Sequence, residues 1–329
     1  MKERLIKIVR AFQEKRIMVL GDMIVDEYWF GDIKRVSREA PVLILEHDYS
    51  ESILGGAANV VNNIVALGGN VLPVSIIGDD ESGKKILELF DKKGIKKDFI
   101  VVDKDKRSNT PTKIRVMAGS LHTTRQQTLR IDRLGKNNYS KDVEDKLIEL
   151  IKENVEDSDV LLVSDYGTGV LSDRIINLVN EISYKIPVVV DSRYKLHKFR
   201  NILMPTPNEE EASYVLKGNS DDFDISEMAR KLAEKLNSKA ALITRGKNGM
   251  VLFDGKDVFN IPVVGSAEAV DVTGAGDTVS SVISLALASG AGFYEAANLA
   301  NAAASIAVMK RGNAVVSAEE LEKVLEKVF

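Results

Sequence analysis

Strand-like and helix-like segments alternate along most of the chain, and this alternation constrains the fold more than any other feature of the sequence. Short runs of β-branched and aliphatic residues, each ending at or next to Gly or Asp, lie at 17–22, 71–78, 159–165, 186–191 and 240–246. Helical patterns lie at 57–67, 81–93, 142–155, 171–184, 208–217 and 224–237. This order predicts an α/β fold with helices on both faces of a mostly parallel central sheet. Ligands are then expected at the carboxyl ends of the strands.

Two segments break the alternation. Residues about 27–50 and about 108–134 are strand-like, with polar and apolar residues interleaved. We interpret them as a small antiparallel β lid that stands off the main body, although ordinary surface hairpins would give a similar pattern. No linker rich in Pro, Gly or Ser divides the chain, so residues 1–329 are predicted to form a single domain with a lid.

Composition excludes several classes of site and partner. The 329 residues include no cysteine and only three histidines, which rules out disulfides, thiolate metal sites and a cysteine nucleophile. A net charge of -4 gives no reason to expect a nucleic-acid or membrane partner. The charged N-terminus predicts an amphipathic helix rather than a signal peptide, and polar residues interrupt the apolar stretch 279–309. We therefore predict a cytoplasmic protein.

One segment imitates a phosphate-binding loop. Residues 78–85, "GDDESGKK", follow a strand and fit most of the pattern G-x-x-x-x-G-K-[ST]. Lys85 replaces the hydroxyl residue that should bind magnesium, and three acidic residues would repel phosphate. We interpret the segment as a helix start whose acids interact with the helix dipole.

A better phosphate-binding segment is "VTGAGDT", residues 272–278. Gly274 and Gly276 allow the backbone N–H groups to converge on an anion, next to the positive end of the helix that follows. Asp277 would stay ionised at that helix start. Phosphoryl transfer to an alcohol needs such an anion site and a carboxylate that takes the hydroxyl proton. A helix N-cap with glycine packing is the simpler alternative.

Three weaker motifs accompany it. The Gly-Gly pair at 55–56 opens a helix and allows close approach of a polyol, with Asn59 one turn further on. Asn208 and Glu211 share one helical face, a spacing that suits a hydrated Mg²⁺ ion. The segment 243–249 ends a strand in a turn that could hold nucleotide phosphates.

In this order, the motifs resemble the ribokinase-like (PfkB) family of carbohydrate kinases over essentially the whole chain. "DVTGAGDT" is similar to the family's C-terminal signature, "GGAANV" to its sugar-binding motif and "NEEE" to its N-x-x-E magnesium motif. The resemblance implies a ribokinase-like three-layer fold, ATP as phosphoryl donor, Mg²⁺ and, in many members, a monovalent cation such as K⁺.

The resemblance also implies a role for each matching residue. Asp277 would be the catalytic base, and the anion hole would consist of Gly274, Ala275 and Gly276. The sugar hydroxyls would contact Asp26, Gly55, Gly56 and Asn59. Asn208 and Glu211 would organise Mg–ATP by binding Mg²⁺ through water. The nucleotide would also contact Thr244, Gly246 and Asn301. Asp271 would help to hold the monovalent cation.

Longer segments narrow the resemblance to one branch. "GDMIVDEYWFGDIKRVSREAPV", "RQQTLRID" and "LVSDYGTGVLSD" look like the heptose-7-phosphate kinases. Members phosphorylate the anomeric hydroxyl of D-glycero-D-manno-heptose 7-phosphate, a step of ADP-heptose biosynthesis. Lys113, Arg115 and Arg130 would then bind the substrate phosphate, and the lid would pair with that of a second copy. Many relatives also carry an adenylyltransferase, an activity that we do not expect in this sequence.

Two positions depart from the branch. Thr168 stands where a lysine is usual, and Ser192-Arg193 stands where Pro-Lys is usual. A kinase for another sugar, sugar phosphate or nucleoside, of the ribose or fructose type, therefore stays open. A sugar- or nucleotide-binding protein without catalysis is a further alternative, but binding alone does not require a base such as Asp277.

Overall fold

The computed structural model describes residues 1–105, 108–119, 125–135, 139–216, 224–265 and 269–329. Residues 120–124 of the predicted second lid segment lie outside the described residues. So does residue 217, the last residue of the helix predicted at 208–217.

The centre of the molecule is a parallel sheet of six strands in the order β10-β9-β8-β1-β4-β5. The strands are β1 (Arg16–Gly21), β4 (Asn70–Gly78), β5 (Ile100–Asp103), β8 (Val160–Asp165), β9 (Val188–Ser192) and β10 (Met204–Pro205). Four of the predicted strands lie in this sheet. Since all strands are parallel, their carboxyl ends meet along one edge, where a ligand site is expected.

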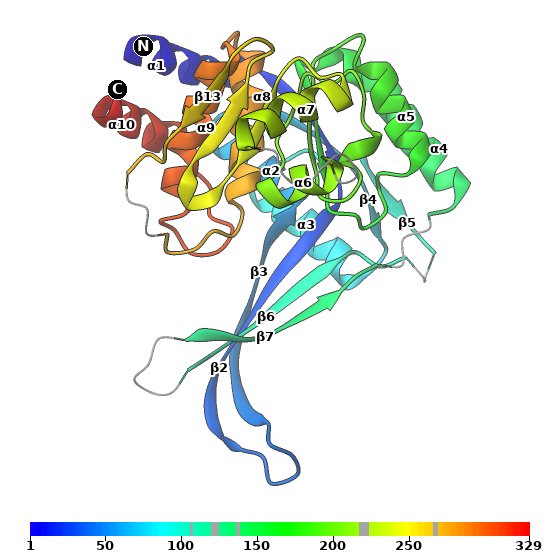
Figure 1. The fold of residues 1–329 in the computed structure, drawn as a ribbon. Helices are drawn as coiled ribbons and strands as arrows, with labels where there is room; N and C mark the ends of the chain where they lie inside the picture. Colours follow the sequence, from blue (N-terminus) through cyan, green and yellow to red (C-terminus); the bar gives the residue numbers. More distant parts are fainter. Residues whose placement is uncertain (106–107, 120–124, 136–138, 217–223, 266–268) are drawn as a thin grey trace.

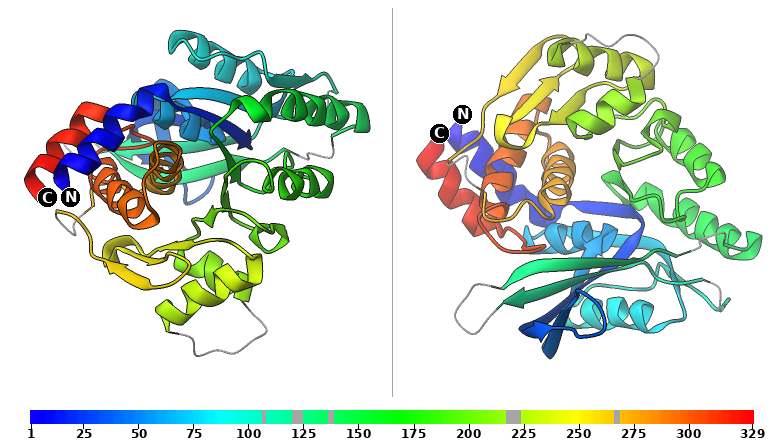
Figure 2. Two further views of the ribbon diagram at one scale, coloured as in Figure 1. Left: turned by 90° about the horizontal axis from the view of Figure 1, so that it is seen from above. Right: turned by 60° about the horizontal axis from the view of Figure 1, so that its bottom comes forward.

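Helices cover both faces of the sheet (Figure 2). One layer contains α1 (Lys2–Arg10), α2 (Ala57–Ala66), α3 (Glu81–Lys92), α8 (Ala275–Ala288), α9 (Phe293–Ala307) and α10 (Ala318–Val328). The other contains α4 (Lys141–Asn154), α5 (Asp173–Ile182), α6 (Glu209–Leu216) and α7 (Ile225–Leu236). Strand β1 shows why two cores form, because Ile17 and Val19 belong to the first and Met18 and Leu20 to the second. The predicted three-layer α/β fold is confirmed.

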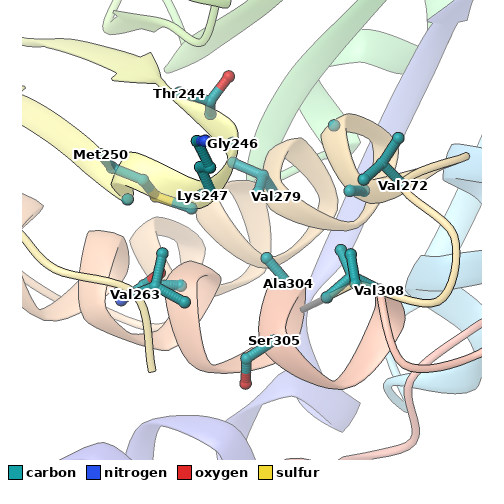
Figure 3. Close-up of a pocket in the computed structure, with 15 residues that line it drawn as sticks. Thr244, Gly246, Lys247, Met250, Val263, Val272, Val279, Ala304, Ser305 and Val308 are labelled. Carbon is teal, nitrogen blue, oxygen red and sulfur yellow. The ribbon is translucent and has the colours of Figure 1, made fainter. Parts of the chain in front are cut away.

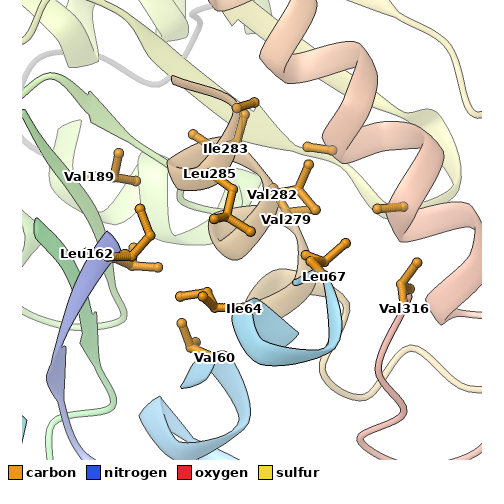
Figure 4. Packing of buried hydrophobic residues seen from close by; sticks show 14 of the residues in the cluster. Val60, Ile64, Leu67, Leu162, Val189, Val279, Val282, Ile283, Leu285 and Val316 are labelled. Atoms are coloured by element: carbon orange, nitrogen blue, oxygen red, sulfur yellow. The ribbon is translucent and has the colours of Figure 1, made fainter. Parts of the chain in front are cut away.

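Helix α8 lies inside the first core. Figure 4 shows its residues Val279, Val282, Ile283 and Leu285 among apolar side chains of α2 and of the sheet. The helix is buried from Asp277 to Ala286, which explains why its sequence is apolar or small on every face. Its N-terminus lies near the carboxyl end of β9, since a Cβ at Gly276 would be 3.9 Å from Oδ2 of Asp191.

A second sheet corrects one prediction. The segment 240–246 was expected in the parallel sheet, but β11 (Ala241–Thr244) pairs antiparallel with β12 (Met250–Phe253), which pairs antiparallel with β13 (Val258–Ile261). A tight turn closed by Arg245 N–H and Gly249 O at 2.9 Å sends the chain straight back. The hairpin therefore determines the partner of β11, and a single parallel bridge joins Thr244 to Asn208.

The lid sheet is formed by β3-β2-β6-β7, with β2 (Met23–Val36), β3 (Leu43–Gly56), β6 (Thr112–Gly119) and β7 (Gln126–Arg133). It extends away from the layered body (Figure 1). Both outer pairs are antiparallel, as predicted, whereas β2 and β6 are parallel. The long strands β2 and β3 begin and end inside the body, where Val25 and Leu54 are buried, so the sheet extends beyond the predicted segment 27–50.

The segment that imitates a phosphate-binding loop is a helix start, as interpreted. Asp80 caps α3, with Oδ1 accepting from the N–H of Gly83 at 2.7 Å. Its Oδ2 accepts from the N–H of Thr110 at 2.8 Å. Lys85 lies 3.1 Å from Glu27 of the lid sheet. In the part of the chain that the structure describes, no helix is long and apolar enough to cross a membrane.

Candidate active site

The N-terminus of α8 lies next to the first turn of α2, because Asn59 of α2 hydrogen-bonds to Asp277 of α8. Gly274 is the N-cap of α8, with φ +77°, and no side chain of the described residues caps this end of the helix. A Cβ at Gly274 would lie 2.9 Å from Nδ2 of Asn59, so the turn requires glycine both for its conformation and for space. The first N–H groups of a helix have no partner within the helix. This end can therefore receive an anion.

Asp277 lies in the first turn of α8 and is only 4% exposed. Its Oδ2 accepts a hydrogen bond from Asn59 Nδ2 at 2.7 Å, and its Oδ1 accepts one from Tyr166 Oη at 2.6 Å. Burial raises the pKa of Asp277 to about 6, although both hydrogen bonds favour the ionised form. A carboxylate with a pKa just below neutral is ionised at pH 7 and basic enough to accept a proton.

The side-chain oxygen of Asn59 can accept a further hydrogen bond. The side chain is completely buried, and Oδ1 has no hydrogen-bond partner among the described residues. An unpaired buried acceptor costs stability unless a ligand or water satisfies it. The position next to Asp277 thus suits a hydroxyl group of a ligand.

The Gly-Gly pair brings Asp26 against the start of α2. Gly56 has φ +55°, and a Cβ at Gly55 would lie 2.4 Å from Oδ2 of Asp26. Asp26 accepts hydrogen bonds from Arg115 of β6 and from Asn313. Asn313 also donates to the carbonyl of Leu54 at 3.1 Å. The carboxylate of Asp26 therefore joins the lid sheet to the segment that follows α9.

The three predicted phosphate-binding cations lie on one face of the lid sheet but differ in their partners. In the register of the sheet, Arg115 is opposite Arg130. Arg115 forms an ion pair with Asp26, and Arg130, which is 52% exposed, forms one with Asp132 at 2.9 Å. Lys113 makes no ion pair with the described residues; its Nζ lies 4.9 Å from the ring centroid of Tyr166. Burial lowers its pKa.

A cavity of about 220 Å³ lies beside the start of α8 (Figure 3). It is lined by three of the residues predicted to bind ATP, namely Thr244, Gly246 and Asn301, together with Ala275 and Gly276 of the predicted anion hole. Most of the remaining lining is apolar, as in Met250, Val263, Val272, Val279, Ala304 and Val308. Asn301 is held by a hydrogen bond to Pro262 O at 2.7 Å. Small apolar walls with a few polar groups suit a flat aromatic ligand group.

Asn208 and Glu211 bond to each other at the start of α6. Asn208 Oδ1 accepts from the N–H of Glu211 at 2.8 Å, and Glu211 Oε2 accepts from the N–H of Asn208 at 2.9 Å. The backbone bridge to Thr244 places the pair next to a residue of the cavity. Burial raises the pKa of Glu211. Among the described residues, no group of three or more His, Asp or Glu is arranged to hold a metal ion.

Asp271 orders the loop before α8. Its Oδ1 accepts from the N–H of Thr273 and its Oδ2 from the N–H of Gly312, both at 2.9 Å. Burial alone would raise the pKa of Asp271, but these hydrogen bonds lower it overall. The carboxylate therefore stays ionised between two loops.

Sequence reasoning missed four residues of this region. Asp22, after β1, accepts hydrogen bonds from the backbone N–H groups of Tyr166 (2.8 Å), Thr168 (3.1 Å) and Val170 (3.0 Å). Asp191, on β9, has its pKa raised well above the ordinary value by burial, with Glu211 and Asp277 adding to the effect. The available signal was an aspartate at the end of each neighbouring parallel strand. Tyr166 and Asn313 carried no such signal.

The two positions that depart from the branch follow adjacent strands of the central sheet. Thr168 follows β8, and Arg193 follows β9, with its N–H bonded to Asp165 O at 3.1 Å. The guanidinium of Arg193 is exposed and lies 5.7 Å from the ring centroid of Tyr194. In the described residues it forms no ion pair. It acts on Lys113 as a like charge that lowers the pKa of that residue.

The sequence of the chain matches one known protein family. Residues 14–320 match the pfkB family of carbohydrate kinases. The chain belongs to this family. Its members transfer a phosphoryl group to a sugar hydroxyl, and the predicted family is confirmed.

Similar sequences support the same family assignment. The chain is 41% identical to bifunctional protein HldE of Geotalea uraniireducens (strain Rf4), covering 94% of this chain and 62% of that protein. It is 37% identical to bifunctional protein HldE of Campylobacter concisus (strain 13826), covering 95% and 65%. These relatives match the heptose kinase branch that the sequence resembles. The chain spans less than two thirds of their length.

Solved structures show the same fold at low identity. The phosphofructokinase-2 of Escherichia coli in complex with substrates and products is 18% identical, with a TM-score of 0.77 and coverage of 95% and 99%. Arabidopsis thaliana ribokinase complexed with ribose and ATP is 21% identical, with a TM-score of 0.71 and coverage of 95% and 98%. The ribokinase-like fold is thereby confirmed.

Proposed function

We propose that this chain is an ATP-dependent kinase for D-glycero-D-manno-heptose 7-phosphate and phosphorylates its anomeric hydroxyl, as in ADP-heptose biosynthesis. The observation that carries the proposal is the position of Asp277. Its carboxylate contacts Asn59, whose Oδ1 has no partner among the described residues and can bind a hydroxyl. The start of its helix lines the cavity that contains Thr244 and Asn301. A base between a hydroxyl site and a nucleotide cavity is the arrangement that phosphoryl transfer needs.

The proposed reaction uses residues of the chain in three roles. Asp277 accepts the proton of the attacking hydroxyl. Gly274, Ala275 and Gly276, at the uncapped start of α8, stabilise the negative charge of the transferred group through backbone N–H groups and the helix dipole. Asp26 and Asn59 orient the sugar through its other hydroxyls, and Gly55 and Gly56 let it approach the backbone.

ATP and Mg²⁺ fit the remaining residues. The cavity beside α8 would hold the nucleotide, with Asn301 near the base and with Thr244 and Gly246 near the ribose or phosphates. Glu211 bonds to Asn208 through one carboxylate oxygen, which leaves the other for the water shell of Mg²⁺. When bound, Mg²⁺ would neutralise charge on the phosphates. A kinase that uses ATP works where ATP is supplied, so we place the protein in the cytoplasm.

The substrate phosphate would bind chiefly at Lys113. Arg115 and Arg130 already have carboxylate partners, whereas Lys113 has none among the described residues. Arg193, which forms no ion pair with the described residues, would supply a second cation in place of the charge that is missing at Thr168. Two like charges near each other are stabilised by an anion between them.

A monovalent cation is proposed at Asp271. This carboxylate stays ionised, and it is bonded to both the loop before α8 and Gly312. The phosphofructokinase-2 of Escherichia coli has been solved in complex with potassium. A K⁺ ion at Asp271 would steady the loop that carries the anion hole.

We also propose a homodimer formed through the lid sheet. The sheet and its ends carry exposed apolar residues that water would otherwise surround, namely Val36, Val42, Leu43, Leu129, Ile131 and Leu134. Exposed apolar patches on an extended sheet commonly mark an interface.

A substrate panel tests the proposed function. The purified protein is incubated with ATP, Mg²⁺ and heptose 7-phosphate, heptose, ribose, fructose, fructose 6-phosphate or adenosine, and the products are identified by mass spectrometry. We expect a bisphosphate from heptose 7-phosphate. Turnover of unphosphorylated sugars alone would favour a ribose- or fructose-type kinase. Tight binding of sugar or ATP without turnover of any compound would favour a non-catalytic binding protein.

A further inference from the structure

Tyr166 forms a hydrogen bond with the proposed base Asp277, and the proposed reaction gives it no role yet. It follows β8 at the carboxyl edge of the central sheet and is held at both ends. Its backbone N–H donates to Asp22 Oδ2 at 2.8 Å, and its hydroxyl donates to Asp277 Oδ1 at 2.6 Å. Lys113 Nζ lies over its ring at 4.9 Å from the centroid. The ring is therefore fixed by the sheet edge, the base and the lid sheet together.

The hydroxyl of Tyr166 completes the support of the carboxylate. Asn59 holds Oδ2 and Tyr166 holds Oδ1, so the carboxylate plane has a donor on each oxygen and cannot turn freely about its last bond. Each oxygen retains a second lone pair for an incoming hydroxyl. An orientation that is fixed before the substrate binds lowers the barrier to proton transfer.

From this geometry we infer that Tyr166 is a positioning residue for the base Asp277, an inference that rests on the proposed function. The residue acts on the reaction through Asp277 and does not itself transfer a proton. A phenylalanine would fill the same space and keep the contact with Lys113, so the hydroxyl alone carries the role.

The hydrogen bond also has an electrostatic effect that can be measured. A donor to the ionised carboxylate lowers its pKa, so removal of the donor raises it. The other charged or titratable groups that face Asp277 are Asp26 from β2, Lys113 from β6 and Asp191 from β9. The pKa of the Tyr166 hydroxyl is raised well above its ordinary value, so the group is neutral at pH 7. Tyr166→Phe therefore changes no charge and leaves these three side chains in place, and a shift in the pKa of Asp277 reports chiefly on the lost hydrogen bond.

The test is Tyr166→Phe, with Tyr184→Phe as control. Tyr184 is 77% exposed, and its hydroxyl also makes one hydrogen bond, with Asn201. We expect Tyr166→Phe to lower kcat by about 10- to 100-fold, with KM values for sugar and ATP within about threefold of the parent enzyme. The acid limb of the rate profile should move to higher pH. Unchanged kcat and an unchanged acid limb would overturn the inference.

A second measurement does not depend on activity. The pKa of Asp277 is followed by ¹³C NMR of protein labelled at aspartate carboxyls, with Asp277→Asn identifying the signal. We expect the pKa to rise in Tyr166→Phe and to fall when 3-fluorotyrosine, whose hydroxyl is the stronger donor, replaces Tyr166. Shifts in these two directions with no turnover of any sugar would refute the proposed function but keep the hydrogen bond. Absence of both shifts in an active enzyme would refute only the role of Tyr166.

Discussion

Asn59 and Asp277 are 218 positions apart in the sequence, and their side chains meet in a hydrogen bond of 2.7 Å from Nδ2 to Oδ2. The bond joins the first turn of α2 to the first turn of α8, and both side chains are buried. It leaves the other polar atom of Asn59 without a partner in the described residues. Asn59, which is proposed to bind the sugar, and Asp277, the proposed base, are thus hydrogen-bonded directly to each other.

Asp277→Asn should abolish catalysis but not nucleotide binding. Asparagine has the same shape but cannot accept the proton, so we expect kcat to fall by about 10²- to 10⁴-fold. ATP affinity, measured by calorimetry, should stay within about threefold. Asp98→Asn, a change at an exposed aspartate, is the control. Full activity of Asp277→Asn would show that the base is another residue.

Asn59→Asp should shift the pH dependence of the reaction. In the parent enzyme, kcat/KM should fall as the pH drops below about 6, because burial raises the pKa of the base to about 6 and the protonated base is inactive. An aspartate at position 59 places a second carboxylate against Asp277, and like charges at this distance raise the pKa further. The acid limb should therefore move to higher pH, by at least about one unit. An unmoved limb would contradict the contact between the two residues.

Gly274→Ala should impair both stability and turnover. The added Cβ would meet Asn59 Nδ2 at 2.9 Å, in a residue with φ +77°. Gly290→Ala is a matched control, since Gly290 has φ +79° and the added Cβ would have no heavy atom of the described residues within 4 Å. Both variants should lose about 1–2 kcal/mol of unfolding free energy. Only Gly274→Ala should also lose kcat, by about tenfold or more, because it displaces Asn59; equal kcat values would refute that reason.

Lys113→Met should discriminate between phosphorylated and unphosphorylated sugars. Loss of a charged hydrogen bond to phosphate costs about 1.5–3 kcal/mol, so KM for heptose 7-phosphate should rise by about 10- to 100-fold. Turnover of a sugar without phosphate should change little. Lys96→Met, at an exposed lysine outside the proposed site, should leave both unchanged. An equal rise for both sugars would place the substrate phosphate elsewhere.

Leu129→Glu should dissociate the proposed dimer without unfolding the chain. Leu129 is 55% exposed on β7, so the monomer loses little by the change, whereas a charge buried in an interface is costly. Analytical ultracentrifugation at micromolar concentration should show a dimer for the parent protein and a monomer for the variant. Val328→Glu, at a 45% exposed position of α10, should stay dimeric. A monomeric parent protein would contradict the proposal.

Local pattern was enough to predict most elements of the fold. The helices predicted at 57–67 and 81–93 are α2 (Ala57–Ala66) and α3 (Glu81–Lys92). Hydrophobic periodicity and capping residues act between neighbours in the chain, so they are visible in the sequence. The family was also predictable, because its glycine and aspartate motifs occur as short continuous segments.

Strand pairs and ion pairs between residues far apart in the sequence were not predictable in the same way. Strand β11 was expected in the parallel sheet, but the hairpin turn after it determined an antiparallel partner. Arg115 and Arg130 were grouped with Lys113 as phosphate ligands, yet each arginine has a carboxylate partner. The pattern of residue types does not reveal which charges neutralise one another, since that depends on the register of the strands.

The sequence by itself determined the alternation of elements, the glycine turns and the residue types at the site. Only the tertiary structure decided that Asn59 and Tyr166 hold opposite oxygens of Asp277 and that Lys113 lies over the same tyrosine ring. The physical reason is distance along the chain. Secondary structure follows from interactions within a few residues, whereas these contacts arise only when α2, β6, β8 and α8 pack around one edge of the central sheet.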